Sequence, residues 1–304
     1  MNDLCIRDLA HVVRGRLRLA DMPPLGGEWE PIQRIVLDLE QVGPGDVAVL
    51  GGQDAETNLT TAPGDSGWVE EAYLRGALGI VTAGRPIEPW AGRFSVNVKN
   101  TKLAVRRLAA WARRRFNGML TIVLESQAHA PIGPTIDQHL CRDGFVKGSW
   151  TMATEWLDVA SALLRLSTRD RYAIISVTGK KRSVIAACAD LFAPHVAVMT
   201  QQSCGRPGLS AAESAIVAAL PDHGWVVVPA DRPIAESPMP QEQWVRVMPG
   251  ELVATVGSLM SGWGANSEEL PETPNTSGEW SLFTDAVNSW DAREHRFLTQ
   301  RRKK

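Results

Sequence analysis

Apolar residues recur along the chain in two spacings, one typical of helices and one of short buried strands. In residues 101–116, Ala104, Leu108, Trp111 and Ala112 share one arc, as a helix requires. Similar patterns predict helices over residues 3–13, 68–75, 152–166, 183–192 and 210–220. Apolar runs bounded by turn residues predict strands over residues 32–38, 47–50, 77–82, 94–98, 120–124, 172–177, 196–199 and 225–228.

The order of these elements predicts the fold class. From residue 120 onward, short apolar strands alternate with helices, which is the order of a parallel sheet covered on both faces. We therefore expect an α/β protein with a small N-terminal α/β domain over residues 1–117. A doubly wound, mostly parallel-sheet central domain is expected over residues 118–262, and a linker with an amphipathic, basic C-terminal tail over 263–304.

The predicted tail permits two interpretations. Residues 267–279 are rich in Glu, Pro, Ser and Thr and contain no basic residue, as a flexible linker would. Apolar residues at 282, 283, 287 and 290 follow, and the chain closes on two arginines and two lysines. This segment is either a docking helix for an acidic partner or a frayed, solubilising terminus.

Composition narrows the function classes. The 32 basic and 34 acidic side chains give a net charge of −2, which favours neither nucleic acid nor a membrane surface as partner. No apolar run is long enough for a transmembrane helix, and the first residues do not resemble a secretory signal. The four cysteines are widely spaced, which is typical of reduced thiols in the cytoplasm.

Two groups of polar residues are candidate sites, and each also has a purely structural interpretation. Lys102, Arg106 and Arg113 lie on one arc of the helix predicted over 101–116. This arc is either an anion- or nucleic-acid-binding surface or a solvated outer face. The alternating run of Asp137, His139, Cys141 and Asp143 could hold a metal, but its spacing matches no standard zinc pattern. Surface polar residues are the favoured interpretation there, and no metal is expected.

No nucleotide-binding motif is complete. The only Gly-Lys pair, Gly179-Lys180, lacks the earlier glycine of a phosphate-binding loop, and no dinucleotide fingerprint is present.

Several stretches taken in order resemble the Mur ligases, most closely the enzymes that add D-alanyl-D-alanine to a UDP-N-acetylmuramoyl tripeptide. They are RIVLD at 34–38, VGPGDV at 42–47, WVEEA at 68–72, GALGIV at 76–81, APHVAVMT at 193–200 and LPDHGWVVV at 220–228. The resemblance covers about residues 1–235. It implies a Mur-type nucleotide-binding fold, ATP and Mg²⁺ as cofactors, and a role in peptidoglycan synthesis.

The departures from the family pattern concern its active-site groups. Glu125 and His129 fall in the family's T-G-x-x-G-K-T loop, where His129 replaces the lysine that neutralises the phosphates. Ser176 falls on the magnesium-binding glutamate, and Glu213 on the lysine that is carbamylated in the family. The family histidine has no counterpart in residues 201–206, and we expect the third family domain to be missing.

Two functional hypotheses follow. The first is a catalytically inactive Mur-ligase-like pseudoenzyme without a cofactor, which binds a protein partner, a second copy of itself or a UDP-N-acetylmuramoyl peptide. Leu39-Glu40 in place of the family's Ser-Arg puts uridine-nucleotide binding in doubt. The alternative is an active ATP- and Mg²⁺-dependent ligase that clamps phosphates with Lys180, Lys181 and Arg182 at a helix start.

The two hypotheses predict different arrangements. Backbone N–H groups that converge on one point near Gly133 or Gly179 would favour the active enzyme. Glu125 and Glu213 projecting into the place of ATP would favour the inactive protein.

Overall fold

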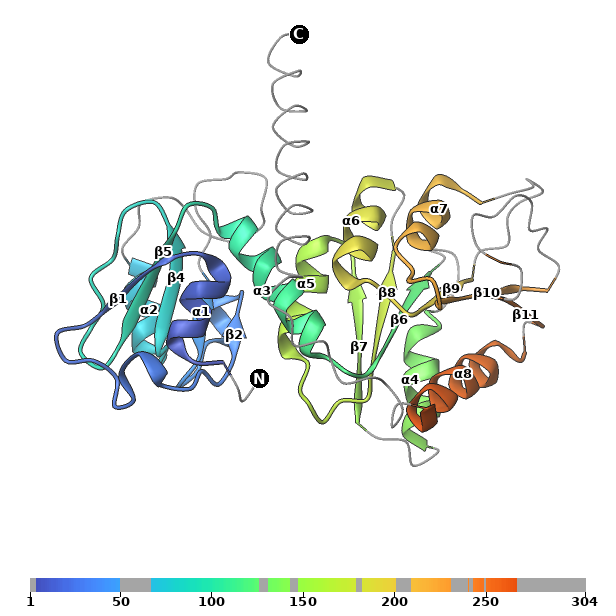
Figure 1. The fold of residues 1–304 in the computed structure, drawn as a ribbon, viewed down its shortest axis with the longest axis horizontal. Helices are drawn as coiled ribbons and strands as arrows, with labels where there is room; N and C mark the ends of the chain where they lie inside the picture. Colours follow the sequence, from blue (N-terminus) through green and yellow to red (C-terminus); the bar gives the residue numbers. More distant parts are fainter. Residues whose placement is uncertain are drawn as a thin grey trace, which may run out of the picture. The chain divides into compact units, whose positions relative to one another are not determined.

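The computed structural model describes residues 4–49, 67–125, 131–142, 147–178, 182–200, 209–230, 240, 243–248 and 250–266 (Figure 1). Within these residues the chain forms two sheets with helices on their faces. Among the described helices, none has the length and apolar character needed to cross a membrane.

The first sheet has five strands in the order β1-β5-β4-β3-β2. Strand β1 is antiparallel to β5, and the other neighbours are parallel. Its elements in chain order are α1 (Ile6–Val13), β1 (Arg16–Leu19), β2 (Ile35–Val36), β3 (Val47–Val49), α2 (Gly67–Leu74), β4 (Gly79–Ala83) and β5 (Phe94–Val98). Two short 3-10 helices, Gly27–Trp29 and Leu39–Gln41, lie in the connections.

The second sheet has six strands in the order β11-β10-β9-β6-β8-β7, all paired in parallel. Its elements are α3 (Thr101–Arg115), β6 (Met119–Leu124), α4 (Gly133–Arg142), β7 (Gly148–Ala153), α5 (Trp156–Arg165), β8 (Tyr172–Val177), α6 (Arg182–Phe192), β9 (Val196–Met199), α7 (Ala211–Ala218), β10 (Trp225–Pro229), β11 (Trp244–Val247) and α8 (Leu252–Asn266). Strand β6 lies between β8 and β9, so the chain winds outward on both sides of it. The predicted fold class, α/β with a mostly parallel central sheet, is confirmed.

The helix predicted over residues 152–166 is wrong at its start. Met152 and Ala153 belong to strand β7, and the helix begins at Trp156. The carboxylate of Asp158 determines this boundary, because it accepts the backbone N–H groups of Thr154 and Glu155 at 2.8 and 3.1 Å. The linker and tail predicted beyond residue 266 lie outside the described residues.

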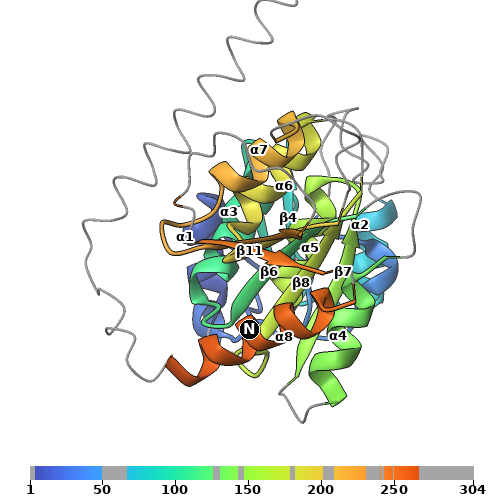
Figure 2. The same ribbon diagram turned by 90° about the vertical axis from the view of Figure 1, so that its right-hand side faces the viewer.

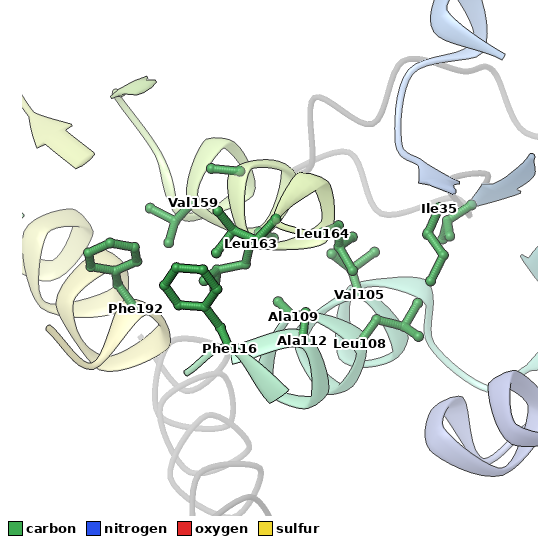
Figure 3. Packing of buried hydrophobic residues seen from close by; sticks show 14 of the residues in the cluster. Ile35, Val105, Leu108, Ala109, Ala112, Phe116, Val159, Leu163, Leu164 and Phe192 are labelled. Carbon is green, nitrogen blue, oxygen red and sulfur yellow. The ribbon is translucent and has the colours of Figure 1, made fainter. Parts of the chain in front are cut away.

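One hydrophobic core connects the two sheets through α3. It begins at Ile35 and Val47 of the first sheet and continues through Leu108 of α3 to Leu163 of α5 and Phe192 of α6 (Figure 3). Helices α4 and α8 cover the opposite face of the second sheet, where both contribute to a separate core cluster (Figure 2). The division at residue 117 stays a prediction, since buried residues continue across it.

The basic residues of α3 make contacts within the protein. This is a third role beside the two predicted ones, a solvated face and an anion-binding surface. Arg113 donates to the carbonyls of Phe192 and Ala193 at the end of α6, at 2.9 and 2.8 Å. The guanidinium of Arg106 lies 4.9 Å from the centre of the Trp156 ring. Lys102 is half-buried and also has an interaction partner.

Arg113 also faces a half-buried histidine. The backbone N–H of Leu120 donates to Nδ1 of His195 at 3.0 Å, and Arg113 Nη2 lies 3.3 Å from Nε2. Burial, followed by the positive charges of Arg113 and His223, lowers the pKa of His195 from 6.5 to about 3. His195 is therefore neutral in the folded protein at neutral pH.

We predict that His195 makes the fold sensitive to acid. Its pKa is about 6.5 when unfolded and lower when folded, so the unfolded state binds the extra proton between these values. The contribution of His195 to the free energy of unfolding is therefore fully present above pH 6.5. It decreases as the pH falls toward 3, by at most ~1.4 kcal/mol per pH unit.

Urea unfolding of the wild type and His195→Asn across this pH range tests the prediction, because asparagine keeps a hydrogen-bond acceptor but does not titrate. The difference in unfolding free energy between the two proteins should shrink as the pH falls. A constant difference would contradict the assignment.

Candidate functional site

Glu125 lies directly after β6, the strand from which the second sheet winds in both directions. Its backbone N–H continues the sheet pairing by donating to the carbonyl of Val177, the last residue of β8, at 3.1 Å. Only 3% of the residue is exposed, although it carries a carboxylate. A buried carboxylate is costly unless polar partners compensate it, so its surroundings define the site.

The carboxylate of Glu125 lies against the start of helix α4. The backbone N–H of Ile132 is shared between its two oxygens at 3.0 and 3.1 Å, and that of Gly133 donates to Oε1 at 2.9 Å. The first N–H groups of a helix have no partner within the helix and carry the positive end of its dipole. Since Ile132 has no side-chain acceptor, Glu125 caps α4 from a neighbouring strand.

Strand β8 supplies the third donor. The hydroxyl of Ser176, which is fully buried, donates to Glu125 Oε1 at 2.8 Å. The indole Nε1–H of Trp150 on β7 donates to Ser176 Oγ at 3.0 Å. Because an indole nitrogen can only donate, it leaves the single proton of Ser176 directed toward Glu125.

A glycine permits this close approach. A Cβ atom on Gly133 would lie 2.2 Å from Ser176 Oγ and 2.3 Å from Trp150 Nε1. Any other residue at 133 would force α4 away from β7 and β8. Glu125, Ser176, Trp150 and the start of α4 thus form one network, the Glu125 network.

The second predicted glutamate has a different environment. Glu213, also buried, is the third residue of α7 and forms a capping box with Ser210. Ser210 N–H donates to Glu213 Oε2 at 2.7 Å, and Glu213 N–H donates to Ser210 Oγ at 3.3 Å. These bonds give Glu213 a role in starting α7.

The other predicted site residues are less defined. His129, Lys180 and Lys181 lie outside the described residues, as does Gly179. Arg182 is the first residue of α6 and is exposed to solvent.

Three of the four predicted metal candidates, Asp137, His139 and Cys141, lie on α4. Asp137 and Cys141 are one turn apart and both contact the Tyr172 hydroxyl, at 2.9 and 3.4 Å. Burial, followed by these two groups, raises the pKa of Tyr172. Within the described ranges, no three His, Cys, Asp or Glu side chains are grouped to hold a metal, and Asp143 lies outside them.

Sequence reasoning missed Trp150, which lies on an edge strand that was not predicted. It left the stretch around Pro131 and Pro134 open between a loop and a helix start, and in the structure α4 begins there at Gly133. Proline is compatible with a first helical turn, so Pro134 was a usable signal for a helix start. The Ser-x-x-Glu spacing at 210–213 was a signal for the α7 capping box.

We predict that Gly133→Ala destabilises the protein by about 1–3 kcal/mol, because the added methyl group would displace Ser176 and Trp150. Gly250→Ala is the matched control, since a Cβ there meets no atom within 4 Å, and should change stability by less than about 0.5 kcal/mol. Denaturant unfolding measures both. Equal effects would show that the close contact at Gly133 is unimportant.

Comparisons with known proteins identify the fold. No protein-family model and no characterised protein matches the sequence. The structure is similar to that of the UDP-N-acetylmuramoylalanyl-D-glutamyl-2,6-diaminopimelate–D-alanyl-D-alanyl ligase from Acinetobacter baumannii. That match has 18% identity and a TM-score of 0.55, and covers 75% of this chain and 49% of the ligase.

A second crystal structure of MurF from the same organism matches with 20% identity and a TM-score of 0.56, covering 75% of this chain and 48% of that one. The chain thus spans about half the length of the structures it matches. It has a Mur-ligase-like fold.

Proposed function

We propose that this Mur-ligase-like protein does not catalyse ATP-dependent ligation and acts instead as a binding or scaffolding protein linked to peptidoglycan precursor synthesis. The observation that carries the proposal is the Glu125 carboxylate on the N–H groups of Ile132 and Gly133. It favours the inactive protein, although the N–H groups do converge on one point, because that point already holds a negative charge.

Phosphate binding at such a position depends on free N–H donors at a helix start. By the sequence resemblance, Glu125 lies in the stretch that corresponds to the phosphate-binding loop of the Mur ligases. The carboxylate takes the donors that a phosphate would need and would repel it at close range. The residues at the start of α4 therefore do not fit the phosphates of a nucleoside triphosphate.

The position of the magnesium-binding glutamate supports the same conclusion. Ser176 offers a neutral hydroxyl whose proton is donated to Glu125 and whose oxygen accepts the Trp150 N–H. Mg²⁺ prefers carboxylate and phosphate oxygens, so this position is a poor magnesium ligand. Glu213, at the position of the carbamylated lysine, supplies a carboxylate engaged in helix capping.

The alternative of an active ligase depends on Lys180, Lys181 and Arg182 as a phosphate clamp. Two of these residues lie outside the described part of the chain, and the third is exposed. The alternative stays a hypothesis that the same experiment tests.

Three kinds of binding partner are compatible with this proposal. A protein partner, a second copy of the chain or a UDP-N-acetylmuramoyl peptide would each suit a Mur-like fold that has lost ATP chemistry. We expect this role in the cytoplasm, where the peptidoglycan precursor would be met, with neither nucleic acid nor a membrane span involved.

The proposal predicts that ATP with Mg²⁺ does not bind. Calorimetric titration to millimolar ATP should give no saturable heat, with or without a UDP-N-acetylmuramoyl tripeptide. Phosphate release in the presence of D-alanyl-D-alanine should stay at the level without protein. The Acinetobacter baumannii ligase serves as the positive control.

Saturable ATP binding, or phosphate release that depends on the peptide, would overturn the proposal. Peptide binding without phosphate release would support a binding role with that ligand.

A further inference from the structure

The hydrogen-bond donors of the Glu125 network are arranged to bind a negatively charged oxygen. Among the described residues, the groups directed at Glu125 Oε1 are two backbone N–H groups and one hydroxyl, at 2.9, 3.0 and 2.8 Å. Hydrogen bonds to a charged acceptor are stronger than those between neutral groups. Three donors and the positive end of α4 therefore favour a negative oxygen at this point.

We propose that the N–H groups of Ile132 and Gly133, together with the Ser176 hydroxyl, form an oxyanion site whose permanent ligand is the Glu125 side chain. The inference rests on the proposed function, since it identifies what fills the position that a nucleotide phosphate would take. It adds that the site keeps its affinity for an oxyanion and accepts a small carboxylate from solution when Glu125 is shortened.

The donors are held independently of Glu125, which the proposal requires. Ser176 is fully buried within β8, between β6 and β7. Helix α4 is fixed by Ile136 and Leu140, which are buried in the core cluster shared with α8. The site is therefore preorganised and should survive removal of its ligand.

The side chain itself defines the size of the ligand. Glu125→Ala removes a methylene and a carboxylate, which is the composition of acetate. Acetate can restore the missing charge and both oxygens, whereas acetamide has a similar shape but is neutral and carries an N–H donor group in place of one acceptor oxygen. Comparison of acetate with acetamide therefore distinguishes an oxyanion site from a cavity that accepts any molecule of this size.

Thermal unfolding of the full chain at neutral pH tests the inference with wild type, Glu125→Ala and Glu125→Gln. We expect Glu125→Ala to melt several degrees below the wild type, because three donors lose their acceptor. Sodium acetate should raise its Tm in a saturable way, by about 3 °C at ten times the dissociation constant. Sodium chloride at equal ionic strength and acetamide should not.

Two further variants define the site. Glu125→Gln keeps the shape of the side chain without its charge, so it should also melt below the wild type while blocking acetate. Adding Ser176→Ala to Glu125→Ala removes one donor and should weaken acetate binding several-fold. If Glu125→Ala does not fold in chloride, recovery of helical circular dichroism on refolding in acetate replaces Tm as the readout.

Equal responses of wild type and Glu125→Ala to acetate, equal rescue by acetamide, or no recovery in acetate would overturn the inference. These results are independent of the proposed function. If the wild type binds ATP and acetate rescues Glu125→Ala, only the proposed function is overturned. If the wild type does not bind ATP and acetate does not rescue Glu125→Ala, only this inference is overturned.

Discussion

A carboxylate buried in a protein interior must be compensated by hydrogen-bond donors, because an uncompensated charge there is among the most destabilising features a fold can contain. The structure around Glu125 satisfies this constraint with donors from α4 and β8. The start of α4, the absence of a side chain at Gly133 and the indole that orients Ser176 all contribute to this compensation. The charge at the end of the central strand is thus matched by donors that its neighbours hold in place.

The rest of the fold keeps these donors in place. A core shared by both sheets holds α3, α5 and α6 on one face of the second sheet, and α4 packs with α8 on the other (Figures 2 and 3). Arg113 reinforces the first face by donating to the carbonyls at the end of α6. Three of the charged groups thus stabilise helix ends: Glu125 and Glu213 at starts, and Arg113 at an end.

The sequence predicted the central strands because β6 and β8 are continuous apolar runs that are buried along their whole length. The edge strands β1, β7 and β11 escaped prediction, and β7 shows why, since it is half-exposed and mixes Gly, Ser and Thr with Trp150. The position of Glu125 was anticipated from the family resemblance. Its hydrogen bonds were not, because they depend on a helix whose start contains two prolines and on a tryptophan from an edge strand.

The central claim is that the anion position at the start of α4 belongs to Glu125 and not to a nucleotide. A crystal structure grown with ATP and Mg²⁺ in large excess tests it most directly. The account predicts the Glu125 carboxylate within hydrogen-bonding distance of the N–H groups of Ile132 and Gly133, with no phosphate there. Electron density for a phosphate that accepts these N–H groups, with Glu125 turned away, would contradict it.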